Sequence, residues 1–452
     1  MIKAHGVDVD AYLRGEMVMH FRRITLTQRH AANPIVFKGA GHVHLDKGHL
    51  RYVVYHTCVG DEANRHMAMS FSGQAGELIN LDSLFDFEGQ DLNGNIWTAE
   101  GVDTSGGNYR SEFCVVEGSI EFLRSQRPSS GSRPNTLHQI YFHDPHFPAP
   151  WLHVAPGLEF LCGESTVTIT KDESGCDVSV LDGHLSDEFS RAISKALNVL
   201  SGVRLQLGVA EKIYQGVSAV QLYSRDVQLS NQQLPPPVEI PFRCASDFFG
   251  QVFNLLVEFI EQDGAVYYDN WNKLNRAWQA GIESAALNVS VCIEGVLKTY
   301  FGALGTDKNF AELTKLAIPA VMELEIDKRV KDLLRSCLGG AGNFKPKNAL
   351  RALTESGKIS PELGGKWNKL RSETAHAVVA GEAREDWQRM ADLTFGNIKL
   401  FYEILFAITG YTGQRIDYES RGFPSASPST RYHETPSAED DIRPSCDHSS
   451  VG

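Results

Sequence analysis

The chain has 452 residues, of which 42% are hydrophobic and 22% charged, and its formal net charge is −13. This composition predicts a packed core and a length suited to two domains. The acidic balance argues against a protein that coats long nucleic acid by charge alone. No apolar run reaches the roughly 18 residues of a membrane helix. The N-terminus has no apolar segment after its first lysine, so we expect no secretory signal and a cytoplasmic location.

The eight cysteines are scattered along the chain without any CxxC spacing. Zinc ribbons and dense disulfide frameworks need such spacings. We therefore expect reduced thiols, no structural metal and no cofactor.

Residues 1–230 are predicted to form a β-rich domain, because short runs of alternating polarity are separated by Gly, Asp and Asn turns. The clearest runs are VFKGAGHVHLD (36–46), HLRYVVYHTCV (49–59), MAMSFSG (67–73) and STVTITKD (165–172). The polar, Pro- and Gly-containing segment 125–135 is expected to be a loop. An amphipathic helix is expected over 187–201, followed by two closing strands.

Residues 231–245 read as a linker, since three successive prolines favour extended backbone. Residues 246–412 have helical periodicity, which predicts an all-α bundle with short connections. The expected helices cover 249–260, 274–300, 307–337, 348–358, 361–379 and 386–409. Residues 413–452 are polar and are expected to be a mostly disordered tail. The predicted class is therefore α+β, with two domains.

The pattern Arg-x4-His occurs in this chain at Arg51, Arg133, Arg371 and Arg443. Such a short pattern carries little weight without structural context. The first match falls in a predicted strand, where a five-residue offset sends the side chains to opposite faces. The second follows a predicted loop and the fourth lies in the tail. Only Arg371 with His376 falls in a strongly amphipathic helix.

On that helix the predicted buried face consists of Trp367, Leu370, Thr374, Ala377 and Val378. Arg371 borders this face, whereas His376 points away from it. The two are separated by about 140° on a helical wheel, so they do not form a simple one-turn patch. They are placed either to line two sides of a groove or to meet a second copy of the helix across a dimer.

The run ISPEL…LRSETAHA resembles the signature of the HEPN superfamily, in which an Arg-polar-x-x-x-His motif lies on a helix and Ala often precedes the histidine, as Ala375 does here. The stretch ITGYTGQRIDYESRGFP resembles the segment that follows the last helix in prokaryotic HEPN proteins. A β-rich domain before such a bundle is similar to the abortive-infection, anti-phage group. The resemblance implies a HEPN helical bundle and a metal-independent endoribonuclease that acts as a homodimer.

The resemblance also implies roles for the motif residues. His376 would be the general acid or base when the ribose 2′-hydroxyl attacks the adjacent phosphate, because the ordinary pKa of a histidine side chain lies near neutrality. Arg371 would bind that phosphate, because its planar guanidinium matches phosphate oxygens. Ser372 stands where active members often have Asn, Asp or His, and its hydroxyl can still orient phosphate or imidazole. The alternative is a non-catalytic HEPN scaffold that binds RNA or only dimerises.

Other polar clusters complete the expectations. The RNA backbone would be received by Lys345, Lys347, Arg351, Lys366 and Lys369. The β-rich domain would sense a trigger, such as a phage-derived one, or control access. Glu294 is expected to be a partner charge in the bundle or a support near the site. The histidine-rich segment from His138 to His153 reads as a structured loop rather than a zinc site.

Overall fold

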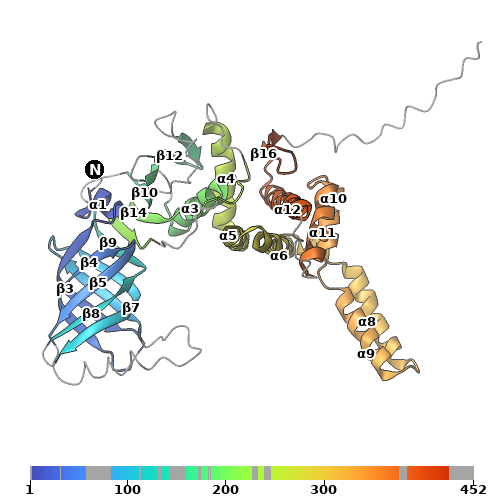
Figure 1. Cartoon of the computed structure of the whole chain (residues 1–452), viewed down its shortest axis with the longest axis horizontal. Helices are drawn as coiled ribbons and strands as arrows, with labels where there is room; N and C mark the ends of the chain where they lie inside the picture. The colour runs from blue at the N-terminus through green and yellow to red at the C-terminus, as the bar shows by residue number, and fades with distance from the viewer. Residues whose placement is uncertain are drawn as a thin grey trace, which may run out of the picture. The chain divides into compact units, whose positions relative to one another are not determined.

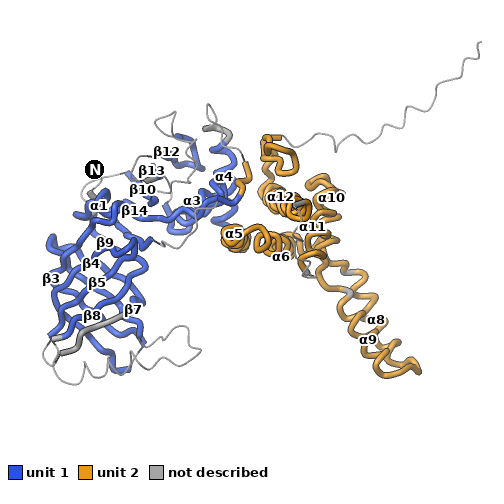
Figure 2. The backbone as a smooth tube through the Cα atoms, in the orientation of Figure 1, with its two compact units in different colours: residues 1–234, 240–264 blue, residues 235–239, 265–452 orange. Residues whose placement is uncertain are grey.

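The computed structural model describes residues 3–30, 32–57, 83–110, 113–129, 134–142, 158–171, 175–181, 183, 185–225, 233–238, 246–375 and 384–426. The chain divides into two compact units (Figure 2). The first unit comprises residues 1–234 and 240–264, and the second comprises 235–239 and 265–452. The expected order, a β-rich part followed by a helical part, is confirmed. Segment 67–73, predicted as a strand, lies outside the described residues.

The first unit contains a sheet that closes on itself (Figure 1). Its described strands are antiparallel, and the pairing of β7 with β8 completes the ring. In spatial order they are β7 (Ile96–Arg110), β6 (Phe85–Asp91), β3 (Val18–Gln28), β4 (Val36–Asp46), β5 (His49–His56) and β8 (Phe113–Ile120). The expected strand at 36–46 coincides with β4, because alternate side chains of this run point into the ring.

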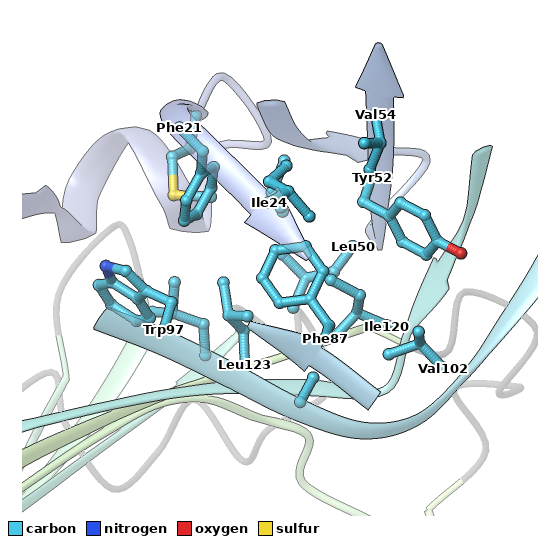
Figure 3. Packing of buried hydrophobic residues seen from close by; sticks show 14 of the residues in the cluster. Phe21, Ile24, Leu50, Tyr52, Val54, Phe87, Trp97, Val102, Ile120 and Leu123 are labelled. Carbon is cyan, nitrogen blue, oxygen red and sulfur yellow. The ribbon is translucent and has the colours of Figure 1, made fainter. Parts of the chain in front are cut away.

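Buried aromatic and β-branched side chains fill the closed sheet (Figure 3). Trp97 and Tyr52 are fully buried, and the Tyr52 hydroxyl donates to the backbone oxygen of Asp103 at 2.9 Å. A short N-terminal segment packs beside this core through β1 (Lys3–Ala4), β2 (Val7–Asp8) and α1 (Val9–Leu13).

His5, in the turn between β1 and β2, is the most buried histidine among the described residues. Its ring nitrogens lie 3.2 Å from Ser125 Oγ and 2.9 Å from Ser218 Oγ. Burial, with Arg127 nearby, lowers the pKa of His5 to about 4, although Asp91 opposes the shift. The imidazole is therefore neutral near pH 7, and it ties the N-terminal segment to two strands of the sheet.

The sheet continues beyond the closed part as an open layer. From the closed part outward its described strands are β9 (Phe122–Pro128), β15 (Val217–Tyr223), β14 (Leu207–Tyr214), β10 (Thr136–Phe142), β13 (Gly175–Leu181), β12 (Ser165–Lys171) and β11 (Leu158–Cys162). The expectation of a loop over 125–135 is wrong for its first part, because residues 125–128 belong to β9. Backbone pairing with β15 outweighs the polar and proline content of that segment.

Two helices accompany the open layer, α3 (Asp187–Ser201) and α4 (Ser246–Gln262). The bounds of α3 match the predicted helix, since Ser186 caps its N-terminus and Gly202, at φ 68°, ends it. Helix α4 was expected to start the helical bundle, but it belongs to the first unit. Phe249 and Phe253 pack on Phe160 of β11, with ring centroids 5.6 and 5.2 Å apart.

The second unit is helical. Its described elements are α5 (Ala265–Gln279), α6 (Ile282–Tyr300), α7 (Gly302–Gly305), α8 (Lys308–Glu323), α9 (Lys328–Ala341), α10 (Pro346–Glu355), α11 (Pro361–Ala375), α12 (Arg384–Thr409) and the short strands β16 (Arg415–Ile416) and β17 (Ser425–Ala426). None of the described helices is long and apolar enough to cross a membrane.

Two long helices that we expected are each divided in the structure. The expected helix 274–300 breaks at Gly281, whose φ of 115° is unfavourable for residues with a side chain. The expected region 307–337 is a hairpin of α8 and α9. Asp327 caps the second of these helices, because its carboxylate accepts a hydrogen bond from the Arg329 backbone nitrogen at 2.8 Å.

The first part of the expected disordered tail is folded. Lys399 on α12 binds Asp417 at 2.6 Å and Glu419 at 2.7 Å. The Tyr418 hydroxyl donates to the backbone oxygen of Pro236, so the proline segment belongs to this unit rather than being only a linker. Residues 427–452, which include the Arg443 motif match, lie outside the described residues.

Candidate functional site

Helix α11 carries the predicted motif and is anchored by one apolar face. Leu363, Trp367 and Leu370 are almost fully buried, and the Trp367 indole donates to the backbone oxygen of Ser290 on α6 at 3.2 Å. This confirms the predicted buried face for Trp367 and Leu370. Thr374 is half-buried, and its hydroxyl donates to the backbone oxygen of Leu370 at 2.9 Å. Ala377 and Val378 lie outside the described residues.

Arg371 borders the buried face, as predicted, and its side chain is 50% exposed. One guanidinium nitrogen lies 3.1 Å from a carboxylate oxygen of Glu294 on α6. The guanidinium carbon is 5.5 Å from the centroid of the Trp367 ring. A carboxylate and an aromatic ring thus fix the direction of the guanidinium while leaving part of it accessible to solvent.

Ser372 is exposed on the same helix. His376 follows the last described residue of α11, Ala375, and lies outside the described residues. The distance from Arg371 to His376 is therefore not given.

The competing Arg-x4-His matches have other surroundings. His56 lies on β5, is 8% exposed and packs against Phe37. Its Nδ1 lies 2.8 Å from the backbone oxygen of Lys38. His138 lies on β10, with Nδ1 3.0 Å from Ser179 Oγ, and its partner Arg133 lies outside the described residues. His56, buried on its strand, is not accessible to an RNA backbone.

The expected RNA-binding cations differ in their surroundings. Lys345, Lys347 and Lys369 are exposed. Arg351 is 70% exposed and only 3.9 Å from Glu355, a weak surface pair. These four are accessible to a polyanion, as we expected.

Lys366 is different, because it belongs to an internal ion-pair network. Its Nζ is 2.5 Å from Glu419, which also binds Lys399, and its side chain is 34% exposed. Hydrogen bonds from these lysines lower the pKa of Glu419 in spite of its burial. The interpretation of Lys366 as a freely available RNA-binding residue is therefore not favoured by its contacts.

A groove of about 510 Å³ lies between α11 and α12. Lys366, Lys369 and Arg389 line it together with Glu385 and Asp392. The groove therefore carries mixed charge instead of a purely basic lining.

A second and more enclosed pocket, here called the α3 pocket, lies in the first unit between α3 and the open layer. Its volume is about 440 Å³. The residues of α3 that face it recur every three or four positions: Asp187, Ser190, Arg191, Ser194 and Lys195. The opposite wall is built from alternate residues of β9, β15 and β10, together with Leu207, Ala210 and Lys212 of β14.

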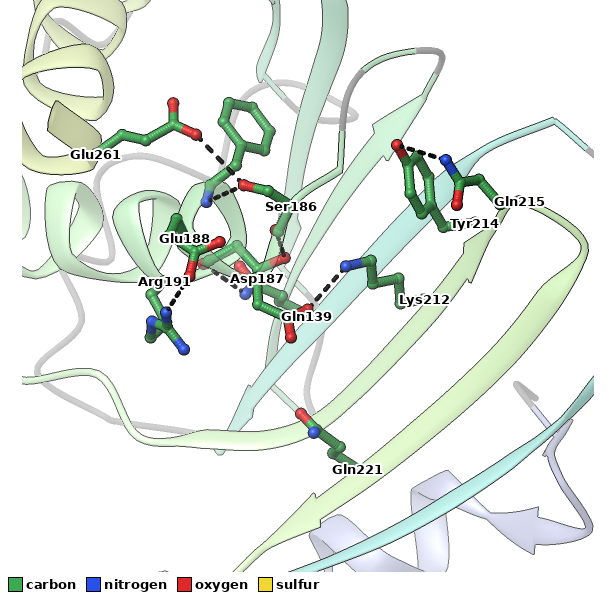
Figure 4. A network of polar contacts seen from close by, with 12 residues as sticks. Gln139, Ser186, Asp187, Glu188, Arg191, Lys212, Tyr214, Gln215, Gln221 and Glu261 are labelled. Carbon is green, nitrogen blue, oxygen red and sulfur yellow. Dashed lines mark hydrogen bonds and ion pairs between the residues drawn. The ribbon is translucent and has the colours of Figure 1, made fainter.

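Polar contacts join the helix to the sheet at this pocket (Figure 4). Lys212 on β14 binds Asp187 at 2.8 Å, and Gln139 on β10 donates to the backbone oxygen of Ser190 at 2.9 Å. The hydrogen bond from Lys212, aided by the charges of Arg124 and Arg191, lowers the pKa of Asp187. The field in the pocket therefore favours negative charge.

The sequence-based reasoning missed the α3 pocket. A signal was present, since Arg191 and Lys195 lie four residues apart on the predicted helix 187–201. The other wall was not recognisable, because Arg124 lies beside the segment read as a loop. Its neighbours in space come from strands more than ten residues away along the chain.

Comparisons with known proteins identify no relative of this chain. No protein-family model, curated protein or solved structure matches the chain. The assignment of a function therefore depends on the motif residues and their surroundings.

Proposed function

We propose that this protein is a metal-independent endoribonuclease of the HEPN type, with Arg371 and His376 in a site completed by a second copy of the chain. The observation that carries the proposal is the setting of Arg371. Arg371 is half exposed on a helix whose apolar face is buried, and Glu294 and Trp367 orient it. It lies five residues before His376 in the sequence.

The chemistry follows from the two side chains. His376 takes the proton of the ribose 2′-hydroxyl as its oxygen attacks the neighbouring phosphorus. The bond from phosphorus to the 5′-oxygen breaks, and that oxygen receives a proton from a second acid, for which the partner's His376 is the simplest source. Arg371 binds the non-bridging oxygens and stabilises their developing charge. The products are a 2′,3′-cyclic phosphate and a 5′-hydroxyl, and DNA is not cut because it lacks the nucleophile.

The ion pair with Glu294 is compatible with this role. A guanidinium has five N–H donors, so one edge can remain with Glu294 while another receives phosphate. Ser372, exposed beside Arg371, can donate a further hydrogen bond to the same phosphate.

An exposed apolar stripe next to the motif supports dimerisation at this place. On α6, Leu287 is 49% and Val291 is 61% exposed, and they lie on the same face as Glu294, which pairs with Arg371. Residues at this spacing form a continuous ridge on a helix. A second copy is the occupant that fits, because it would cover the ridge and bring two motif helices together.

The dimer has a direct test. Val291→Glu places a charge in the ridge and is expected to give a monomer in sedimentation at micromolar concentration, with loss of RNA cleavage. The matched control is Leu316→Glu on the α8–α9 hairpin, where Leu316 is 76% exposed. A dimer that survives the first change and dissociates with the second would contradict an interface at the motif.

We further propose that the activity serves anti-phage defence in the cytoplasm by abortive infection, with the first unit sensing a phage-derived trigger. Cells that carry the wild-type gene should resist phage and lose viability on infection, whereas cells with His376→Ala should do neither. Survival of defence in the variant would contradict this role.

The alternative is a non-catalytic HEPN protein that binds RNA or only dimerises. The pairing of Arg371 with Glu294 favours it to some extent, because the same contact stabilises the bundle. The two are separated by incubating purified protein with total RNA in EDTA. Cleavage that leaves 2′,3′-cyclic phosphate ends supports the enzyme. A dimer that binds the RNA and does not cleave it supports the scaffold.

A further inference from the structure

The α3 pocket has an excess of positive charge. Among the described residues that line it, Arg124, Arg191, Lys195 and Lys212 are cationic, and Asp187 is the one carboxylate. Glu188, outside the lining, binds Arg191 at 2.8 Å. Even with that carboxylate included, cations outnumber anions in a chain whose overall charge is −13.

The same pocket has an aromatic and apolar part. Phe122 on β9 and Tyr223 on β15 lie side by side, with ring centroids 6.2 Å apart and planes inclined by 35°. Leu137, Leu207 and Ala219 continue this surface. Flat rings of this kind provide platforms on which a nucleobase stacks.

Polar groups lie between the cationic and the aromatic parts. The Tyr223 hydroxyl donates to the Gln221 side-chain oxygen at 2.5 Å, and burial raises the pKa of Tyr223 to about 12, so that it stays protonated. The Gln221 amide also carries N–H donors. It can therefore read hydrogen-bond acceptors on the edge of a bound base.

We propose that the α3 pocket binds a free nucleoside phosphate, with the phosphates at Arg124, Arg191 and Lys195 and the base against Phe122 and Tyr223. The volume of about 440 Å³ lies in the range of about 300–1,000 Å³ typical of small-molecule sites. The acidic balance of the chain argues only against coating of long nucleic acid by charge, whereas an enclosed pocket of this volume fits a small ligand. This proposal does not depend on the ribonuclease activity.

The test is equilibrium binding to the full chain by calorimetry in low salt, with ATP, GTP, CTP, UTP and their monophosphates as ligands. Inorganic triphosphate and a ten-nucleotide RNA serve as comparison ligands. At least one nucleotide should bind saturably, and more tightly than inorganic triphosphate. Arg124→Glu and Lys195→Glu should each raise its Kd at least about tenfold, because charge-assisted contacts to phosphate become repulsive.

Two further variants separate the parts of the site. Ala219→Phe fills the apolar part without changing charge and should weaken nucleotide binding but not the weak binding of inorganic triphosphate. Arg14→Ala removes an exposed arginine of the same unit, paired with Glu16 at 3.0 Å, and should leave the Kd unchanged. Thermal unfolding of each variant checks that it remains folded.

Several results would overturn the proposal. They are the absence of saturable binding by any of these nucleotides at millimolar concentration, equal Kd values for nucleotide and inorganic triphosphate, and nucleotide binding indifferent to Arg124→Glu and Lys195→Glu. If the RNA binds more tightly than the nucleotides, and Arg124→Glu and Lys195→Glu weaken that RNA binding, the pocket belongs to an RNA strand instead of a free nucleotide.

Discussion

The motif helix α11 and the α3 pocket differ in how their residues are distributed along the sequence. The first is marked by Arg371 and His376, which lie five positions apart in the sequence and are recognisable there as a motif. The second is assembled from one helix and four strands, and no short pattern marks it. A site with a motif is therefore found first, even where a site without one has the better-formed cavity.

The largest effect is expected from Arg371→Ala, which tests the motif side of this comparison. Removing the guanidinium takes away phosphate binding and charge stabilisation, so RNA cleavage should fall by at least about 10²-fold. Stability should change little, because the side chain is half exposed. Initial rates on a labelled RNA measure the loss. Arg335→Ala on α9, also exposed, is the control, and an equal loss in that variant would contradict a specific role.

A second prediction concerns the unit that holds the α3 pocket. The folded-state pKa of His5 is lowered from 6.5 to about 4, so its contribution to stability is present above pH 6.5 and is lost as pH falls toward 4. The loss amounts to at most about 3 kcal/mol. Its partners Ser125 and Ser218 lie on β9 and β15, beside pocket residues Arg124 and Ala219. Acid should therefore weaken the first unit.

Chemical unfolding at pH 7 and pH 4.5 measures this effect, with hydrogen exchange to assign the unit that opens. In His5→Gln, which cannot take up the proton, the part of the pH dependence due to His5 should disappear. An unchanged pH dependence in that variant would show that His5 does not cause it.

Elements with strong local signals in the sequence were predicted correctly. Helix α3 and strand β4 were predicted with their bounds, because each has a complete local signal: a Ser cap and a Gly end for the helix, and strict alternation for the strand. The buried face of α11 followed from helical periodicity at Trp367 and Leu370.

The failures share a different physical origin, since each depends on contacts between distant segments. Residues 125–128 form a strand through pairing with β15 and, at Ser125, with β7. Lys366 pairs with Glu419, 53 residues later along the chain, a contact that no local pattern marks. Helix α4 looks like a member of the bundle by composition, but its phenylalanines pack on β11. Periodicity carries no information about such partners.

The smallest effect is expected at Glu294, which we regard as a positioning residue for Arg371. Glu294→Ala should lower the cleavage rate by about tenfold, since a misplaced guanidinium binds the transition state less well. Glu294→Gln keeps a hydrogen-bond acceptor and should restore most of the rate. Stability should change by less than about 1 kcal/mol in either variant, as for a partly exposed ion pair. Equal rates in the alanine variant and the wild type would remove Glu294 from the account.

The central claim, that the motif on α11 is catalytic, is tested most directly by RNA cleavage in EDTA with purified wild-type protein and His376→Ala. We expect the wild type to leave 2′,3′-cyclic phosphate ends. The variant should lose at least about 10²-fold in rate, the usual contribution of a general acid or base. His56→Ala, which changes a competing Arg-x4-His match, should cleave as the wild type does once corrected for its folded fraction. Cleavage by His376→Ala at the wild-type rate would contradict the catalytic assignment.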